Sequence, residues 1–390
     1  MGEWREQQLC ELVDISSSKR IFYNEYVSVG IPFYRSKEII EKHNGKTIST
    51  ELQISIEKYN DIKEKFGVPV EGDLLLTSVG TLGIPYIVQK DENFYFKDGN
   101  LTWFRNFNNS LLNKFLYYWI ISPIGKSEID MVSIGSTQPA LTIMGLKGII
   151  INIPPLAEQR AIASVLSSLD DKIDLLHREN KTLEAIAGIL FRQWFVEEAS
   201  DDWEEILLND IYMFDKGFEP GSRNYLENKE ADSIRFIRVG DMLDLKASTY
   251  IKKEPGQITC GKKDLLVSFD GTIGRVSFGL EGAYSSGIRK VYSLNPVYNS
   301  LGLKYLLFTS REIQDVIKSH SSGTVIAHAG SSIDYLTFRF PKKNRLQEFN
   351  QITDPMFFKI TKNLDQIETL EKLRNNLLPK LISGEVRVKI

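Results

Sequence analysis

The chain is dominated by one long amphipathic segment, residues 153–197. Apolar residues return in it at alternating steps of four and three, which is the a/d seam of a coiled coil. The seam comprises Ile162, Leu166, Leu169, Ile173, Leu176, Leu183, Ala187, Leu190 and Trp194, with the polar Asn180 in the same series. A helix of about 40 residues is about 60 Å long and cannot bury such a seam alone. The sequence therefore requires a partner helix of similar length.

An internal repeat supplies that partner. Residues 264–274 match residues 73–83 without a gap, and residues 234–238 match residues 31–35. Continuing the match aligns Pro341 with Pro154 and predicts a second seam helix over about residues 345–382, ended by Gly384. Pro355 and Pro379 predict a late start, a kink or an early end in this helix. Asn180 and Asn363 both fall in the seam, where a polar residue sets the register of a coiled coil.

The order is thus domain, long helix, domain, long helix, with expected boundaries at residues 1–152, 153–199, 200–340 and 341–390. The expected fold class is α+β: two globular α/β domains related by a pseudo-twofold axis and separated by a long antiparallel two-helix coiled coil. Within the first domain we expect helices at residues 55–66 and 111–121. We also expect one strand over residues 94–104 and a loop with an exit strand over residues 133–151.

Composition excludes several classes of protein. A chain of 390 residues with 42% hydrophobic and 25% charged residues is typical of a soluble globular protein. Its two cysteines, Cys10 and Cys260, are far apart, which argues against a disulfide framework and favours a reducing compartment. No secretory signal and no membrane-length apolar run is found, so a cytoplasmic location is expected. The net charge of −3 does not by itself indicate nucleic-acid binding.

No catalytic site stands out. The segment Asn295-Pro296-Val297-Tyr298 approaches the Asn-Pro-Pro-Tyr motif of adenine methyltransferases, but the matching part of the first half lacks it, which favours a plain loop before a helix. The four histidines show no metal-ligand spacing with cysteine or acidic residues. We therefore expect no catalytic residue, no metal and no cofactor in this chain.

The whole pattern resembles the specificity subunit of type I restriction–modification systems. Its most specific marks are Ile153-Pro154-Pro155-Leu156-Ala157-Glu158-Gln159, the long helix after it, and the C-terminal residues 377–388. The second spacer begins differently, because residues 341–348 keep the proline and a glutamine but not the whole run. The resemblance implies two target-recognition domains, each reading one half of a gapped asymmetric site in double-stranded DNA. It also implies that the helices dock two modification subunits, which carry S-adenosylmethionine and methylate adenine, and that restriction subunits complete the complex.

DNA bases are read by Arg, Lys, Asn, Gln, Ser and Thr side chains on loops. In the first half the candidates are Arg35, Ser36, Lys37, Ser78, Thr81, Lys97, Asn100, Thr137 and Gln138. In the second half they are Arg238, Thr272, Arg275, Ser286, Arg289, Thr324 and His328. The doubled Arg35 and Arg238 are equally consistent with a structural salt bridge to a nearby acid, and the other clusters with solvated loops.

The resemblance implies that the spacer is both a ruler and a docking surface. Its candidate residues are Leu156, Glu158, Gln159, Ile162, Leu166, Leu169, Ile173, Leu183, Leu190, Trp194, Ile360, Ile367, Leu370, Leu377 and Leu381. The alternative function is a non-catalytic adaptor whose helical hairpin assembles protein partners.

Overall fold

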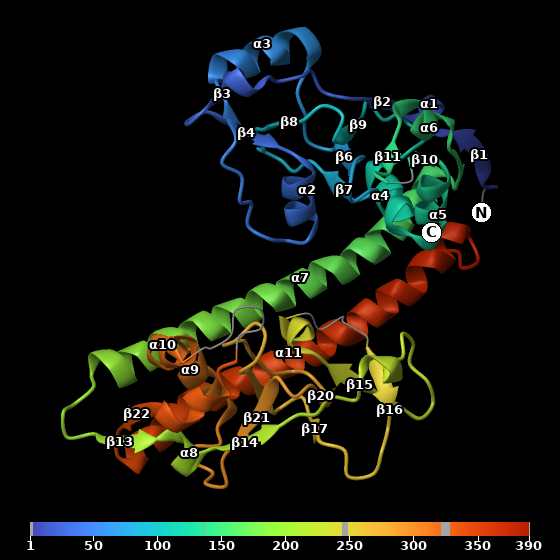
Figure 1. Ribbon diagram of the computed structural model, residues 1–390. Helices are drawn as coiled ribbons and strands as arrows, with labels where there is room; N and C mark the ends of the chain where they lie inside the picture. Colours follow the sequence, from blue (N-terminus) through green and yellow to red (C-terminus); the bar gives the residue numbers. More distant parts are fainter. Residues whose placement is uncertain (1–2, 136, 244–248, 321–327, 390) are drawn as a thin grey trace. The chain divides into compact units, whose positions relative to one another are not determined.

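The computed structural model describes residues 3–135, 137–243, 249–320 and 328–389. The chain divides into two compact units, and each contains parts of both long helices. Unit 1 is Met1–Asp174 with Thr369–Ile390, and unit 2 is Leu175–Glu368. The expected α+β class is confirmed, because each unit combines two four-stranded sheets with packed helices (Figure 1).

Unit 1 is built on an antiparallel sheet of order β2-β9-β6-β7, comprising Asp14–Ser16, Leu101–Arg105, Leu74–Thr77 and Pro85–Ile87. A second sheet has the order β3-β5-β4-β8, comprising Tyr26–Val27, Gln53–Ile54, Ile31–Tyr34 and Tyr95–Phe96. Two further pairs join β1 (Arg5–Gln8) to β12 (Ile150–Ile153) and β10 (Ser133–Ile134) to β11 (Ala140–Leu141). The helices before the spacer are α1 (Leu9–Leu12), α2 (Ser36–His43), α3 (Ile56–Phe66), α4 (Asn113–Ile121), α5 (Pro123–Met131) and α6 (Ile143–Gly148), with a short 3-10 turn η1 (Tyr23–Glu25).

Strand β6 shows why the unit has two cores. Because successive side chains of a strand point to opposite faces, Leu74 and Leu76 pack against the helices, whereas Leu75 packs toward the second sheet beside Trp103. All four residues of the strand are buried. The run of consecutive leucines is thus a strand covered on both faces.

Unit 2 repeats this plan. Its first sheet has the order β14-β21-β18-β19, comprising Met213–Lys216, Ile288–Tyr292, Leu265–Ser268 and Val276–Ser277. Its second sheet has the order β16-β15-β20-β17, comprising Tyr250–Lys252, Ser233–Ile237, Gly282–Tyr284 and Thr259–Cys260. The strand pair β13 (Glu204–Leu207) and β22 (Thr337–Phe340) closes the unit. Its short helices are α8 (Leu208–Ile211), α9 (Leu301–Thr309), α10 (Arg311–Ser319), η3 (Ser222–Asn224), η4 (Val239–Leu243) and η5 (Gly330–Tyr335).

The strand registers confirm the sequence repeat. Phe33 pairs with Tyr95 in a parallel β4–β8 contact, and its counterpart Phe236 pairs with Ala283 in a parallel β15–β20 contact. The second sheets differ at their edges, since unit 1 adds β3 beside β5 whereas unit 2 adds β17 beside β20. The two halves therefore share a scaffold and differ around it.

Two local expectations were wrong. Residues 94–104 form two strands, β8 and β9, because Tyr95–Phe96 pairs in the second sheet and Leu101–Arg105 in the first. The turn between them contains Gly99 at φ 72°. Residues 133–151 also hold more structure than a loop with one strand, since β10, β11 and α6 precede β12.

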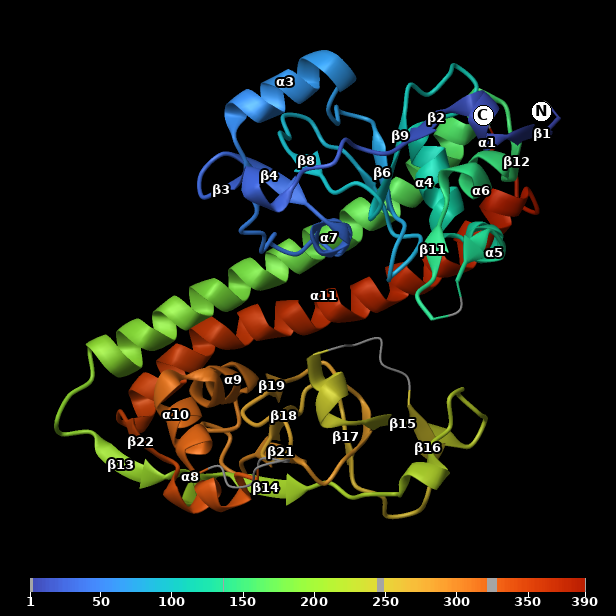
Figure 2. The ribbon, with the colours of Figure 1, turned by 45° about the horizontal axis from the view of Figure 1, so that its top comes forward.

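The two seam helices are α7 (Leu156–Arg192), which runs into a π-helical turn η2 (Gln193–Glu197), and α11 (Lys343–Ser383). Within unit 1, Ile162 and Leu166 of α7 share a core with Leu378 and Leu381 of α11. Within unit 2, Ala187 and Phe191 share a core with Phe349, Phe357 and Ile360. The ribbons of α7 and α11 can be followed in Figures 1 and 2. In each unit, residues early in one helix thus meet residues late in the other, which is the antiparallel pairing expected.

Helix α11 continues through both of its prolines, so the expected late start and early end are wrong. The residues four positions before them, Gln351 and Asn375, are exposed, so water is available to the carbonyls that lose their partners. The helix ends before Gly384, whose φ of 78° terminates it as expected.

Asn180 and Asn363 meet inside unit 2. Asn363 Nδ2 donates to Asn180 Oδ1 at 2.8 Å and to Glu179 Oε2 at 2.9 Å. Their side chains lie in residues only 6% and 1% exposed. The contact expected from the seam is present, and its role in setting the register stays a prediction.

Candidate nucleic-acid interface

In unit 1 the candidate loops converge on the turn between β6 and β7. Ser78 N donates to Asn100 O, and Leu141 N donates to Ser78 O, both at 2.8 Å. Ser36 Oγ donates to the same Asn100 carbonyl at 3.3 Å. Segments that are far apart in the sequence are therefore brought to one edge of the fold. We call the residues Arg35, Ser36, Thr81, Asn100, Thr137 and Gln138 the first turn surface.

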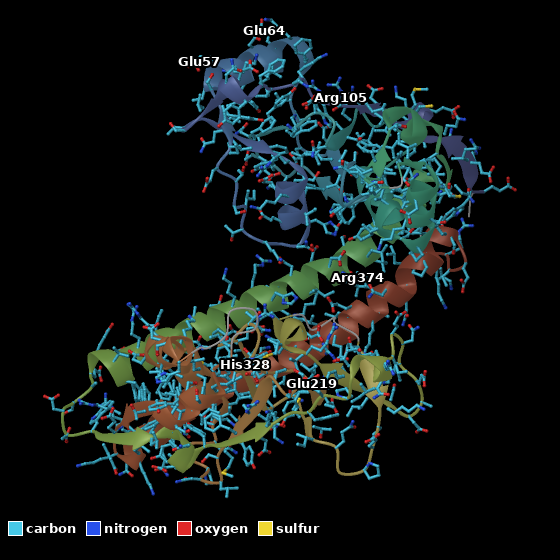
Figure 3. The ribbon with its side chains drawn as sticks, in the orientation of Figure 1. Glu57, Glu64, Arg105, Glu219, His328 and Arg374 are labelled. Carbon is cyan, nitrogen blue, oxygen red and sulfur yellow. The ribbon has the colours of Figure 1, made fainter. Side chains whose placement is uncertain are left out.

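Unit 2 repeats this convergence at the turn between β18 and β19. Asp270 forms a β-bridge with His328, and Phe269 N donates to Gly287 O at 2.8 Å. A side chain at Gly287 would crowd Val239 and Asp270, which shows how closely the turn, the loop before β21 and η4 approach one another. We call the residues Arg238, Asp270, Thr272, Arg275, Ser286 and His328 the second turn surface; His328 and Glu219 are marked in Figure 3.

The doubled arginines have the same geometry in both units. Arg35 binds Glu38 through Nη2 at 2.9 Å, and Arg238 binds Asp241 through Nε at 3.0 Å. Each acid also accepts the backbone N–H of its arginine, at 2.8 and 3.0 Å. The carboxylate hydrogen bond is the main reason that the pKa of each arginine is raised.

These arginines remain accessible. The side chain of Arg35 is 40% exposed and that of Arg238 is 48% exposed, whereas their acids are 0% and 9% exposed. In both pairs the carboxylate takes Nε and Nη2. Among the described residues, no acceptor is hydrogen-bonded to Nη1 of Arg35 or of Arg238. An arginine held on one edge and open on the other is oriented for a further hydrogen-bond acceptor.

The sequence itself carries a signal for this pairing. An acid follows each doubled arginine three positions later, as Glu38 and Asp241. The nearby acid of the expected salt bridge is thus Glu38 in unit 1 and Asp241 in unit 2. The structure confirms the salt bridge and leaves contact with DNA as a prediction.

The other candidates are placed unequally. Thr81, Thr137, Gln138 and Thr272 are exposed, and Lys37 is exposed beside Glu41 at 3.9 Å. Lys97 and Asn100 are half-buried. Arg275 Nη1 donates to Val239 O at 2.8 Å, and Ser286 Oγ donates to Glu219 Oε1 at 2.8 Å. Thr324 lies outside the described residues.

Two candidates are not placed to contact DNA. Ser78 is 2% exposed and its hydroxyl lies 2.7 Å from Thr102 Oγ1, so it belongs to the interior of the sheet. Arg289 is 8% exposed and its Nη1 donates to the Ser286 carbonyl at 2.6 Å. Burial lowers the pKa of Arg289, and the side chain supports the loop rather than presenting a charge.

His328 and Asp270 form a polar pair, of which only His328 is a candidate from the sequence. His328 Nδ1 lies 2.8 Å from Asp270 Oδ1, and the side chain of His328 is 61% exposed. His328 was a candidate, whereas Asp270 was read as part of a hairpin turn. The residues are 58 positions apart, so only the folded chain shows that they meet.

The spacer candidates mostly hold the protein itself together. Glu158 is 1% exposed and pairs with Arg387. Gln159 is 0% exposed; its Oε1 accepts from Leu112 N at 2.8 Å, and its Nε2 donates to Ser110 O and Pro154 O at 2.7 and 2.9 Å. Because of these contacts, neither side chain is exposed on the surface. The Pro-Pro-Leu-Ala-Glu-Gln run thus fastens the start of α7.

The seam residues divide by burial. Ile162, Leu166, Ile173, Ile360, Ile367 and Leu381 are buried, whereas Leu156, Leu169, Leu183, Leu190, Trp194, Leu370 and Leu377 are half-buried. The exposed apolar residues of α7 belong to another set, which lies outside the predicted seam: Leu175, Ile186 and Ile189, exposed by 49%, 42% and 57%. Each lies one position before a seam residue, namely Leu176, Ala187 and Leu190. This regular spacing beside the seam is the sequence signal for a second apolar stripe on α7.

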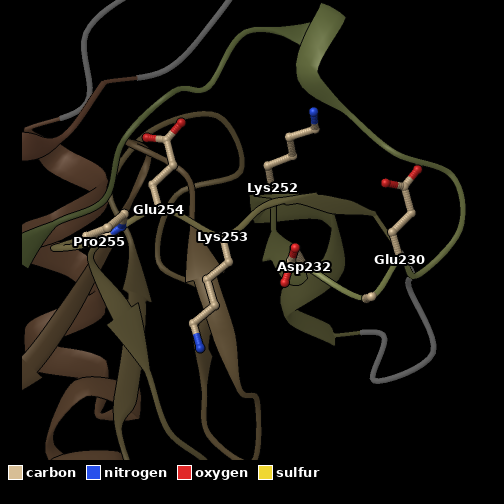
Figure 4. Close-up of a pocket in the computed structure, with 7 residues that line it drawn as sticks. Glu230, Asp232, Lys252, Lys253, Glu254 and Pro255 are labelled. Atoms are coloured by element: carbon tan, nitrogen blue, oxygen red, sulfur yellow. The ribbon is translucent and has the colours of Figure 1, made fainter.

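Unit 2 also contains a cavity away from its strand pair β13–β22 that none of the candidate residues lines. This cavity, of about 690 Å³, is lined by Glu230, Ala231, Asp232, Lys252, Lys253, Glu254 and Pro255. Lys252 and Lys253 point away from each other in it, so its charges do not converge (Figure 4). Over the described residues there is no group of three or more His, Cys, Asp or Glu side chains placed to hold a metal ion. The helices of that same part of the chain include none long and apolar enough to cross a membrane.

The fold and the two turn surfaces define a chain with duplicated, loop-bearing domains and a shared helical pair. Residues 1–185 match the family model of the type I restriction modification DNA specificity domain. The MjaIX type I restriction enzyme specificity subunit of Methanocaldococcus jannaschii is 27% identical over 350 residues, or 82% of this chain and 78% of its own. A putative specificity subunit of Haemophilus influenzae is 34% identical over 165 residues, or 42% and 39% of the two chains.

A solved structure shares the fold. The S subunit of a type I restriction-modification system from M. genitalium matches with a TM-score of 0.60 at 19% identity, covering 97% of this chain and 96% of that one. The chain belongs to the specificity subunits of type I restriction–modification systems.

Proposed function

We propose that this chain reads DNA sequence for its restriction–modification complex, each globular domain reading one half of a gapped, asymmetric site. The main support is the twin geometry of Arg35–Glu38 and Arg238–Asp241, one pair on each turn surface. An arginine positioned in this way suits the O6 and N7 acceptors of guanine. The chain itself carries out no chemistry in this proposal.

The test is enrichment of binding sites from a randomised duplex library, with the modification subunits present. Arg35→Gln is expected to relax one position in one half-site, and Arg238→Gln one position in the other half-site. Each should lose about 1–3 kcal/mol of discrimination at that position. Lys63→Gln and Arg311→Gln each remove one exposed positive charge that is not part of a turn surface, one in each unit, and serve as controls. No enriched gapped motif would refute the proposal.

The alternative, an adaptor that binds only proteins, predicts a different response to salt. Contacts with DNA phosphates make binding fall steeply as salt rises, because bound counterions are released. A steep slope for duplex binding by the full chain supports DNA recognition. No duplex binding at low salt, with modification subunits added, supports the adaptor.

We further propose that α7 and α11 set the distance between the two half-sites. Their antiparallel pairing within each unit allows a matched insertion of one heptad into both helices. The insertion adds about 10 Å, or about three base pairs of duplex. The gap in the enriched motif should widen accordingly, and an unchanged gap would rule out the ruler role.

Docking of two modification subunits is proposed for the exposed side of the helices. Ile186 and Ile189 offer apolar surface there that α11 does not cover. Ile189→Asp should weaken capture of the modification subunit while leaving the helix pair intact, whereas Lys181→Asp at an exposed polar position of α7 should not. S-adenosylmethionine is expected in those subunits, so equilibrium dialysis should find it bound to the complex and not to this chain alone. Restriction subunits would join the same complex.

A further inference from the structure

Unit 1 contains a basic cavity that no turn-surface residue lines. Its volume is about 350 Å³, and it extends along β9 from Arg105 to the Leu101 carbonyl, which accepts from Ser17 Oγ. Figure 3 marks Arg105. The cavity is lined by Ser16, Ser17, Ser18, Lys19, Lys65, Phe66, Gly67, Tyr95, Trp103 and Arg105.

Two serine hydroxyls of this cavity are paired, whereas two other buried polar atoms of it have no partner among the described residues. Ser17 Oγ donates to Leu101 O at 3.5 Å, and Ser18 Oγ donates to Phe96 O at 2.7 Å. Within the described chain, neither Ser16 Oγ nor Arg105 Nε has a hydrogen-bond partner. Because buried polar groups are nearly always paired, two unpaired ones in one cavity indicate that something else satisfies them.

The charge around the cavity is positive. The Arg105 guanidinium stacks on Trp103 at 4.3 Å, and its Nη1 donates to Phe66 O at 3.1 Å, so the side chain is held in place. Lys19 Nζ lies over the Phe66 ring at 4.5 Å and forms no ion pair with any residue in the described part of the chain. Lys65 pairs with Asp61 one helical turn away.

Two carboxylates beside this part of the sheet are already engaged. Asp14, opposite Arg105 in the β2–β9 register, accepts from Asn106 Nδ2 at 2.8 Å. Asp73 accepts from Trp103 Nε1 at 2.8 Å and from Val70 N at 3.0 Å. Neither forms an ion pair with Arg105 in the described structure, so the guanidinium keeps its charge for another anion.

The second half of the chain shows what completes such a site. By strand register, Ser16 opposite Trp103 corresponds to Asp215 opposite Lys290. In unit 2 the Asp215 carboxylate lies 3.9 Å from Lys290 Nζ and accepts from Tyr292 OH at 3.4 Å. Unit 2 therefore has a carboxylate of its own, that of Asp215, at the position where unit 1 has only the hydroxyl of Ser16.

We propose that the cavity of unit 1 binds a phosphate-type oxyanion, with Ser16 Oγ and Arg105 Nε as donors and Lys19 as a further cation. A phosphate group accepts several hydrogen bonds and suits a guanidinium. Two sources offer the same chemistry: a free phosphate, or a phosphate of the duplex backbone. None of the residues that line this cavity belongs to a turn surface.

The variant Ser16→Asp tests the proposal by copying the arrangement of unit 2. Its carboxylate should occupy the anion site and pair with Arg105, so the melting temperature of the full chain should equal or exceed that of the wild type. Titration calorimetry with inorganic phosphate should show an affinity lowered by about tenfold or more, since charge-assisted hydrogen bonds are lost. Arg105→Gln should have the same effect on phosphate affinity. Thr47→Asp, at an exposed position of unit 1, matches the charge change and should have none.

Duplex binding identifies the source. If a backbone phosphate enters the cavity, Ser16→Asp weakens duplex binding and lowers the salt slope by about one, whereas Thr47→Asp does not. If the ligand is a free phosphate, Ser16→Asp lowers phosphate affinity and leaves duplex affinity unchanged. The proposal is overturned if Ser16→Asp and Arg105→Gln bind both phosphate and duplex as the wild type does.

Discussion

Replacing Asn363 by Leu should loosen the helix pair of unit 2 locally. The substitution removes the only donor that Asn180 Oδ1 has in the described structure, and Asn180 is 6% exposed. A buried acceptor left without a donor costs about 1–3 kcal/mol. Glu179 also loses its bond from Asn363, but its side chain is 40% exposed and keeps Lys359 at 3.5 Å. The cost therefore comes mainly from Asn180.

The reverse substitution should be milder. In Asn180→Leu, Asn363 Nδ2 keeps Glu179 Oε2 as an acceptor at 2.9 Å. In the double variant both polar partners are gone and two leucines extend the seam, so stability should be near or above that of the wild type. The order of destabilisation is thus Asn363→Leu, then Asn180→Leu, then the double variant. Because a seam asparagine specifies register, the double variant should also pair its helices less uniquely.

Hydrogen exchange of peptides around residue 180 measures this local opening. A cost of about 1–3 kcal/mol corresponds to exchange about 5- to 150-fold faster. Peptides of unit 1 serve as an internal reference, and Asn376→Leu, at an exposed position of α11, is the matched control. The reasoning is refuted if the two single substitutions add up in the double variant, or if Asn363→Leu exchanges like Asn376→Leu.

Two further predictions concern buried polar groups. Gln159→Leu leaves Leu112 N, Ser110 O and Pro154 O without their side-chain partner; exchange at residues 110–112 should accelerate, whereas in Gln366→Leu, at an exposed position of α11, it should not. Burial lowers the pKa of Lys304 to about 8 from an ordinary 10.5, so the unfolded chain binds more protons between these values and stability should rise from pH 8 to 9.5, by at most about 1.4 kcal/mol per pH unit. Urea unfolding should show this rise for the wild type, and it should disappear in Lys304→Met; an equal rise in both would show that another group titrates.

The elements that the sequence predicted well are those whose apolar residues recur at a regular spacing over many turns. Leu166 and Ile173 of α7, and Ile367 of α11, belong to apolar stripes with helical spacing, and all three are buried. Such a stripe predicts a buried helix face even when the partner helix is unknown. The hairpin of residues 73–83 was likewise recognisable, because it occurs twice. Where the periodic signal was shared between two sheets, as in residues 94–104, the prediction of one strand was wrong.

The candidate site could be predicted only by residue type. Ser78 is a candidate by its residue type alone, but its hydroxyl is buried 2.7 Å from Thr102 Oγ1 of β9. Arg289 looked suitable because arginine reads guanine, but the chain buries it beside its own loop. The exposure of a side chain depends on which distant segment of the chain packs against it. Residue type and local spacing do not determine that contact.

The duplication nevertheless carries more information than either half alone. A salt bridge in one domain, such as Arg35–Glu38, is unremarkable, since surface ion pairs add little to stability. The same pair at the matching position of the second domain, built there with Asp241, means that loops of different length and sequence have kept one orientation of one arginine. By contrast, Ser16 and Asp215 occupy matching positions with different chemistry. What the halves share therefore points to a task common to both, and what they do not share points to a ligand that only one of them needs.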